Sequence, residues 1–211
     1  MKKNIKNIVF DFGGVLLKID TKRTAAAMKD LIGVDLMQLS PDHPTASYLT
    51  RFEKGEISTE TFLNHFQRMA SHPVEPKSII DAWNAMLIGW QRGTLQNLEE
   101  LKKKYNVFLL SNINELHLAW IQNDLKKKHH IQDFESRFFD RVYYSHLIGM
   151  RKPDSNIFHH VQNDAKLDAH STLYFDDLAE NVNIAKKEVG WQSILHPTNE
   201  DVFQTIHQYL T

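Results

Sequence analysis

Short apolar runs recur along the chain, and each one ends in polar or small residues. Five of these runs are rich in β-branched and aromatic side chains and predict strands: Ile8–Phe10, Val107–Leu110, Arg141–Tyr144, Thr172–Phe175 and Gln192–Leu195. Apolar residues at helical spacing lie between these strands, over Leu95–Tyr105, Glu115–Leu125, Ile157–Lys166, Val182–Val189 and Val202–Leu210. Strands that alternate with helices are typical of βαβ units, so the sequence predicts an α/β fold with a parallel sheet.

The segment from Asp20 to Trp90 breaks this alternation. It contains no convincing strand and four helix-like stretches, Thr24–Ile32, Ser47–Lys54, Glu60–Met69 and Lys77–Leu87. We therefore expect a helical domain over residues 20–90, inserted after the first strand. The core domain is then made of residues 1–19 and 91–211. The aromatic side chains of the inserted segment are expected to form its own core.

The composition is that of a globular protein, with 42% hydrophobic and 24% charged residues in a chain of 211. A formal net charge of −1 gives no long-range attraction to nucleic acid or to an anionic membrane, so we expect neither partner. The absence of cysteine excludes disulfides, thiolate metal sites and a cysteine nucleophile. The first apolar run ends too early for a signal peptide, and none reaches the ~20 residues of a membrane span. We expect a cytoplasmic protein that is a monomer or a weak homodimer.

Polar side chains follow three of the predicted strands directly. Asp11 follows the first strand, Ser111 and Asn112 follow the second, and Asp176 and Asp177 follow the fourth. Because the carboxyl ends of parallel strands meet at one edge of a sheet, we expect these side chains to lie close together. Two adjacent carboxylates at such an edge repel each other unless a cation lies between them, and hard oxygen ligands suit Mg²⁺.

Each of these features also has a simpler structural explanation. Asp11 precedes two glycines and is consistent with a plain turn. Ser111 and Asn112 are consistent either with an anion site or with the N-cap of the helix that follows. Lys152, which precedes Pro153, means little by itself. Gly13 and Gly14 allow backbone N–H groups to approach an anion closely, so Gly14 is a candidate substrate-binding residue.

The order of these residues along the chain resembles the haloacid-dehalogenase-like hydrolase superfamily. The segments DFGGVL, FLLSN, GMRKPD and YFDDLAEN match the four motifs of that superfamily in order, and the resemblance covers essentially the whole chain. The segment FEKGEIST looks like the cap loop of its bacterial sugar-phosphate phosphatase branch. The resemblance implies a doubly wound, Rossmann-like catalytic core with a helical cap domain inserted after the first strand.

The resemblance also implies a metal site and a nucleophile. Asp11 would attack phosphorus and form an aspartyl-phosphate. Mg²⁺ would be bound by the Asp11 carboxylate, the Gly13 carbonyl and Asp177, with Asp176 close by or acting through water.

Three further residues would bind the substrate's phosphoryl group. The Ser111 hydroxyl and the Asn112 amide would hold phosphoryl oxygens, and Lys152 would balance charge between the nucleophile and the phosphate. The implied function is a Mg²⁺-dependent phosphatase of small phosphorylated metabolites, in particular sugar phosphates. A catalytically weak metal- and phosphate-binding module and a phosphosugar phosphotransferase are the alternatives. Dehalogenation at carbon is disfavoured because it would leave the paired aspartates without a purpose.

Gly13 departs from the pattern of the superfamily. Most of its phosphatases carry an aspartate at this position, which protonates the leaving alcohol and later activates water, and glycine cannot exchange a proton. Three explanations remain open: a good leaving group such as an anomeric phosphate, a replacement acid from the cap, or a slow or inactive enzyme. The nearest candidates for a replacement acid are Glu53, Glu56 and His43.

Overall fold

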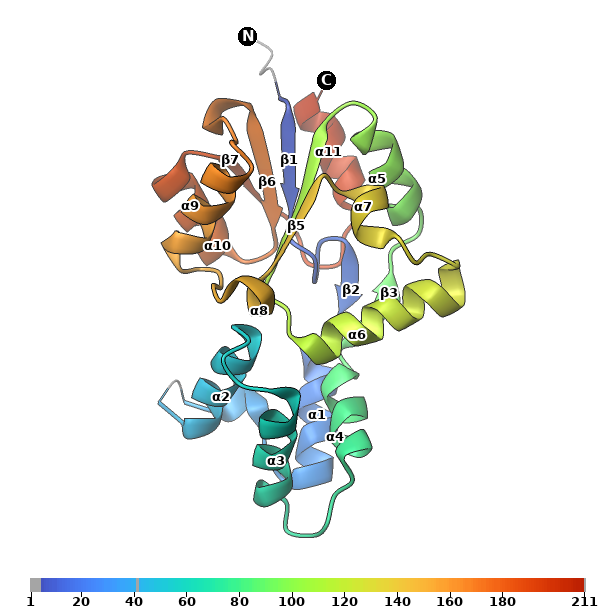
Figure 1. The fold of residues 1–211 in the computed structure, drawn as a ribbon, viewed down its shortest axis with the longest axis vertical. Coiled ribbons are helices and arrows are strands. Elements are labelled where there is room, and N and C mark those ends of the chain that lie inside the picture. Colours follow the sequence, from blue (N-terminus) through green and yellow to red (C-terminus); the bar gives the residue numbers. More distant parts are fainter. Residues whose placement is uncertain (1–4, 41, 211) are drawn as a thin grey trace.

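The computed structural model describes residues 5–40 and 42–210, and its centre is a five-stranded parallel sheet with the strand order β5-β4-β1-β6-β7. The strands are β1 (Asn7–Phe10), β4 (Asn106–Ser111), β5 (Arg141–Tyr144), β6 (Thr172–Asp176) and β7 (Gln192–Leu195). All five predicted strands are confirmed, each within one residue of its predicted bounds. Figure 1 shows their carboxyl ends pointing toward a separate group of helices.

Helices cover both faces of the sheet, which confirms the predicted α/β, doubly wound fold. The period of two along β1 directs Ile8 and Phe10 into one apolar cluster and Val9 into the other. The helices of the first face are α5 (Thr94–Lys102), α6 (Glu115–Asp124), α7 (Phe134–Phe138) and α11 (Val202–Leu210). Those of the second face are α9 (Ser155–Asp164) and α10 (Ala179–Ile184). The short elements are α8 (Ser145–Ile148), the 3-10 turns Leu36–Gln38 and Ala169–Ser171, and the π-helical turns Leu125–His129 and Ala185–Val189.

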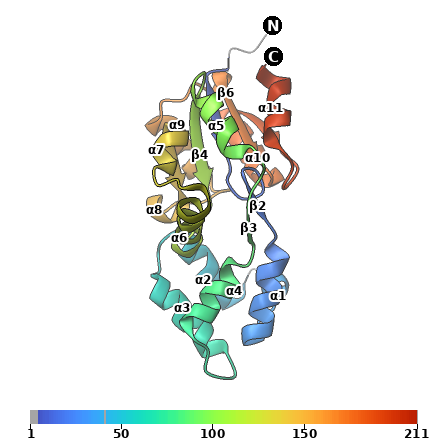
Figure 2. The same ribbon diagram turned by 90° about the vertical axis from the view of Figure 1, so that its right-hand side faces the viewer.

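A group of four helices lies beyond the carboxyl edge of the sheet, as Figures 1 and 2 show. It consists of α1 (Thr21–Ile32), α2 (Pro44–Glu53), α3 (Thr59–Met69) and α4 (Pro76–Asn84), and we call it the helical unit. Asp20 caps α1 by accepting a hydrogen bond from the Lys22 N–H, and Ser58 caps α3 in the same way through Thr61. Phe62 and Phe66 are fully buried at the centre of its apolar cluster, which also includes Leu116 of α6.

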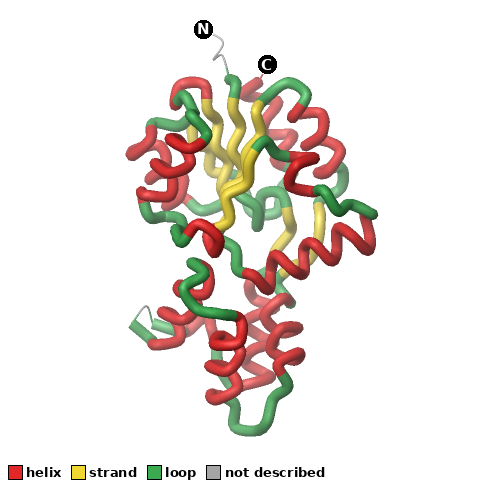
Figure 3. Tube along the Cα trace, viewed as in Figure 1, coloured by secondary structure: helices red, strands yellow, loops and turns green. Residues whose placement is uncertain are grey.

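A two-stranded antiparallel ribbon connects the helical unit to the sheet. It pairs β2 (Leu17–Ile19) with β3 (Leu87–Trp90), both visible as yellow segments in Figure 3. The expectation that residues 20–90 contain no strand was therefore wrong, and the predicted helix Lys77–Leu87 ends earlier, at Asn84. The sequence LIGW of β3 is too short to show a period, and it is a strand because a distant segment, β2, pairs with it.

His117 of α6 joins the core to the helical unit. Its ring stacks on Trp83 of α4, with ring centroids 5.3 Å apart, and its Nε2 lies 3.3 Å from the Trp83 carbonyl oxygen. Its Nδ1 lies 3.1 Å from the side-chain nitrogen of Asn114, the residue that caps α6. These partners fit a neutral ring that donates from Nε2 and accepts at Nδ1. Burial lowers the pKa of His117 from 6.5 to about 4.

We expect this histidine to make the protein less stable in acid. The folded state resists protonation of His117 and the unfolded state does not, so the free energy of unfolding falls as the pH drops from about 6.5 to about 4. The loss reaches about 3 kcal/mol below that window. Denaturant unfolding at several pH values, compared with His117→Gln, isolates this contribution. An identical pH dependence in the two proteins would contradict it.

Candidate active site

The strand order brings the predicted polar residues together at the carboxyl edge of the sheet. Phe10, which precedes Asp11, is in register with Leu109 of β4 and with Phe175 of β6. Asp11 therefore lies between Ser111 and the pair that follows Phe175. Asp11, Ser111 and Asp177 line one cavity of ≈ 540 Å³ at the junction of the sheet and the helical unit, and Asp176 is buried behind it. The expectation that strand ends would place these side chains together is confirmed.

Lys152 occupies the centre of the site. Its side chain is 1% exposed, and its Nζ donates to Asp11 Oδ1 and to Asp176 Oδ2, each at 2.7 Å. A buried ammonium group is costly unless charges of opposite sign surround it, and here two carboxylates do so. The loop before α9 therefore contributes a positive charge, which offsets the negative charges of Asp11 and Asp176 at the ends of β1 and β6.

Asn112 positions this lysine. Its side-chain oxygen accepts the Lys152 N–H at 2.8 Å, and its side-chain nitrogen donates to the Lys152 carbonyl oxygen at 2.7 Å. Both ends of the amide thus bond the backbone of Lys152, and the second N–H of the amide is the one that the expected contact with a phosphoryl oxygen would use. Ser111 differs, because its hydroxyl has no hydrogen-bond partner among the described residues.

The two adjacent aspartates have different surroundings. Asp176 is fully buried and accepts hydrogen bonds from Lys152, from the Asn181 amide, from the Leu178 N–H and from the Tyr174 hydroxyl. Asp177 is only partly buried, and its carboxylate accepts one side-chain hydrogen bond, at 2.9 Å, from Thr198. Asp176 therefore orients the lysine, and Asp177 is the more available of the two to a ligand.

The donor set fits a hard divalent cation. Asp11, Asp176 and Asp177 offer carboxylate oxygens within 4.8 Å of one another. Three carboxylates and one ammonium leave a surplus of two negative charges, which a divalent cation such as Mg²⁺ neutralises. Gly14 makes room for this arrangement, because a Cβ on it would lie 2.3 Å from Asp177 Oδ2.

The pKa of Asp11, the candidate nucleophile, is raised in this site, mainly by burial. Burial raises the pKa of Asp11, the neighbouring carboxylates raise it further, and Lys152 opposes both. Burial also raises the pKa of Asp177, although the hydrogen bond from Thr198 lowers it. A bound cation would favour the ionised form of both, so protons and the metal compete for the same oxygens.

The helical unit contributes charged groups to the other side of the cavity. Glu53 ends α2, and its Oε2 lies 3.1 Å from Arg151 Nε. The buried Ser145 hydroxyl donates to the Glu53 carbonyl oxygen at 2.6 Å. Burial raises the pKa of the Glu53 carboxyl. Of the three candidates for a replacement acid, Glu53 lines this cavity, whereas Glu56 and His43 do not.

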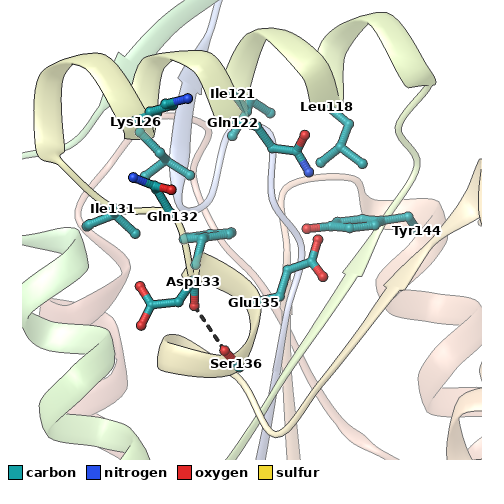
Figure 4. Close-up of a pocket in the computed structure, with 12 residues that line it drawn as sticks. Leu118, Ile121, Gln122, Lys126, Ile131, Gln132, Asp133, Glu135, Ser136 and Tyr144 are labelled. Carbon is teal, nitrogen blue, oxygen red and sulfur yellow. Dashed lines mark hydrogen bonds between the residues drawn. The ribbon is translucent and has the colours of Figure 1, made fainter.

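A second cavity lies between α6 and α7, away from all the predicted site residues. It has a volume of ≈ 490 Å³, and Figure 4 shows Tyr144, Gln122 and Glu135 among the side chains around it. Ile121 contributes to both cavities, so α6 separates them.

The comparisons with known proteins agree with this geometry. The family model described as haloacid dehalogenase-like hydrolase matches residues 5–187, and the chain therefore belongs to that family of hydrolases. The chain is 29% identical over 196 residues to a D-ribitol-5-phosphate phosphatase of Bacteroides thetaiotaomicron, covering 90% of each chain. It is 28% identical over 198 residues to a sesquiterpene phosphatase of Aspergillus oryzae, covering 90% of this chain and 89% of that one.

A solved structure of the same fold contains ligands. A HAD family enzyme of Bacteroides thetaiotaomicron, crystallised with magnesium and inorganic phosphate, superposes with a TM-score of 0.82 at 29% identity, covering 95% of this chain and 98% of that one. Among the described residues, none of the helices combines the length and the apolar character that crossing a bilayer requires.

Substitution of Gly14 tests the metal site directly. Gly14 (φ +81°) and Gly33 (φ +76°) are both left-handed, but a Cβ on Gly33 meets nothing within 4 Å. Alanine at either position costs about 1–2 kcal/mol of folding free energy through backbone strain. We expect Gly14→Ala, but not Gly33→Ala, also to displace Asp177 and abolish Mg²⁺ binding measured by titration calorimetry. Equal Mg²⁺ affinity in the two variants would contradict the assigned role of Asp177.

Proposed function

We propose that the protein is a Mg²⁺-dependent phosphatase of small phosphorylated metabolites that forms an aspartyl-phosphate on Asp11. The observation that carries this proposal is the contact of Lys152 with Asp11 and Asp176, with Asp177 beside them in the same group of carboxylates. The phosphatase names of two relatives, and the magnesium and phosphate in the solved structure of a similar enzyme, support it.

Asp11 is suited to be the nucleophile because Lys152 and a bound cation would offset the negative charge of the carboxylate and of the phosphoryl group. A carboxylate oxygen of Asp11 attacks phosphorus, and the bond between phosphorus and the leaving oxygen breaks. Lys152 offsets the repulsion between this carboxylate and the anionic phosphoryl group, and the Ser111 hydroxyl is free to donate to a phosphoryl oxygen. Mg²⁺, held by Asp11, the Gly13 carbonyl and Asp177, would supply the remaining positive charge.

Removal of the nucleophile tests this proposal. Asp11→Asn keeps the shape of the side chain but cannot form an aspartyl-phosphate, so we expect no phosphate release from an aryl phosphate, measured colorimetrically. EDTA should abolish the wild-type activity, and added Mg²⁺ should restore it. Robust turnover by purified Asp11→Asn would overturn the proposal. Binding of Mg²⁺ and phosphate by the wild type without any turnover would favour a binding module instead.

Glu53 is our proposal for the acid that Gly13 lacks. Of the three explanations for Gly13, the structure favours a replacement acid, because Glu53 lines the cavity that contains Asp11 and its pKa is raised by burial. Its protonated carboxyl would donate to the leaving oxygen in the first step. The resulting carboxylate would then take a proton from the water that attacks the aspartyl-phosphate.

Two substrates distinguish the two steps in a Glu53→Gln variant. On an alkyl phosphate such as a polyol phosphate, the loss of the acid should lower kcat by about 10²–10⁴-fold. On an aryl phosphate the leaving group needs no proton, so the first turnover should remain fast and appear as a burst before a slow steady state. Glu56→Gln is the matched control, because Glu56 ion-pairs with Lys54 outside the cavity. Wild-type kcat of Glu53→Gln on both substrates would contradict the role.

The substrate we propose is a sugar or polyol phosphate. The side of the cavity formed by the helical unit carries Asp20, Lys22 and Glu53, with Arg151 of the core beside them. A hydroxyl group can donate a hydrogen bond to a carboxylate and accept one from a lysine or arginine side chain, so this mixture of charges suits a substrate with several hydroxyl groups. With Glu53 as the acid, a primary phosphate is as acceptable as an anomeric one, and the D-ribitol-5-phosphate named for one relative fits this class.

We further propose that residues 20–90 form a cap over a catalytic core of residues 1–19 and 91–211. The helical unit contributes Glu53 to the cavity. The loop that follows α2 lies close to α8. A Cβ on Gly55 would lie 2.1 Å from the His146 carbonyl oxygen. A cap in this position would exclude water and contact the leaving group.

A further inference from the structure

The loop after β7 contacts the metal site, although the sequence analysis assigned it no role. Thr198 donates through its Oγ1 to Asp177 Oδ2 at 2.9 Å. Its Cγ2 would lie 3.1 Å from a Cβ on Gly14, close behind the two atoms of Asp177 that such a Cβ would meet first. Thr198 therefore touches both the carboxylate most available to a cation and the glycine that makes room for it.

Asn199 holds the two segments beside that carboxylate. Its backbone N–H donates to the Gly14 carbonyl oxygen at 2.6 Å. Its side-chain oxygen accepts the Ile19 N–H at 2.9 Å, and its side-chain nitrogen donates to the Ile19 carbonyl oxygen at 2.8 Å. One residue thus fixes the loop after β1 and the end of β2, with a left-handed backbone (φ 64°) that asparagine tolerates better than most side chains.

Ile19, which Asn199 bonds, also lies beside Gly13. A Cβ on Gly13 would lie 3.2 Å from Ile19 Cδ1, so Ile19 fills the space beside the glycine that lacks the acid. Ile19 is also followed at once by Asp20, which caps the first helix of the helical unit. Asn199 therefore bonds both to β2, the strand that leads into the helical unit, and to the loop that follows Asp11.

We propose that Thr198 and Asn199 are positioning residues for the metal site: Thr198 orients the Asp177 carboxylate, and Asn199 fixes the backbone around Gly14 against it. This inference rests on the proposed function for its biological meaning, but its test does not require turnover. Hydrogen-bond partners that orient a metal ligand are typically worth about 10–100-fold in metal affinity. Thr198 lines the cavity and its hydroxyl donates to Asp177, so we expect its effect on Mg²⁺ binding rather than on the phosphoryl group.

The first test removes the Thr198 hydroxyl and measures binding of Mg²⁺ alone. We expect Thr198→Val to weaken Mg²⁺ binding by about 10–100-fold in titration calorimetry without substrate. The Mg²⁺ concentration that gives half-maximal activity should rise by the same factor, and kcat should recover at saturating Mg²⁺. The matched control is Thr205→Val, which removes a hydroxyl that lies 3.4 Å from His196 Nδ1 and does not contact Asp177. Unchanged Mg²⁺ affinity in Thr198→Val, or an equal loss in Thr205→Val, overturns the proposal.

Conservative variants separate orientation from packing. Thr198→Ser keeps the hydroxyl and should bind Mg²⁺ like the wild type, whereas binding as weak in Thr198→Ser as in Thr198→Val would contradict an orienting role carried by the hydrogen bond alone. Asn199→Gly keeps the left-handed backbone and the N–H donor to Gly14 but loses both bonds to Ile19. We expect its Mg²⁺ affinity to fall less than that of Thr198→Val, and a larger fall would contradict the division of roles.

The two proposals fail in different ways. Mg²⁺ affinity that depends on Thr198, in a protein that releases no phosphate from any substrate, would contradict the proposed function and support the positioning role. Phosphate release by the wild type, with the same Mg²⁺ affinity in the wild type and Thr198→Val, would support the proposed function and contradict the positioning role.

Discussion

The buried ammonium of Lys152 is the interaction on which the rest of the site depends. It contacts carboxylates from the ends of two neighbouring strands, β1 and β6, which would otherwise repel each other inside the protein. Removing one partner of such a buried group costs about 3–5 kcal/mol, because the remaining charges have no compensation. The Asn112 amide bonds the backbone of the lysine, so the ends of three strands, β1, β4 and β6, meet around the loop that carries the charge.

The same balance of charge explains why a cation is required. With one ammonium among three carboxylates, the site relieves its surplus negative charge either by protonating Asp11, whose pKa is raised, or by binding a divalent ion. Protonation would inactivate the proposed nucleophile. In the proposed mechanism, metal binding and nucleophilicity at Asp11 are therefore two consequences of one electrostatic constraint, and a residue that orients Asp177 would influence both.

The sequence predicted what depends on local pattern and missed what depends on distant partners. The five strands and their polar ends follow from apolar runs, and strand order alone then places Asp11 beside Asp176. By contrast, β3 exists because it pairs with β2, and Asn199 acts on Ile19, 180 positions away in the sequence. A threonine and an asparagine after a strand suggest only a turn, so no local signal identifies Thr198 and Asn199. The bonds of Asn112 were missed for the same reason, because its partner is the backbone of Lys152, 40 positions away in the sequence.

The lack of an acid at Gly13 links the proposed proton transfer to the helical unit, which carries Glu53. Ile19 fills the space beside the glycine, so a side-chain acid has no room there without displacing it. Glu53 instead reaches the cavity from α2, where Arg151 and the buried Ser145 hydroxyl hold it. An acid on the sheet would serve the substrate whether or not the helical unit is docked, but an acid on the helical unit can serve it only when docked. With Glu53 as the proposed acid, proton transfer to the leaving group would depend on docking of the helical unit, which would also exclude water from the site.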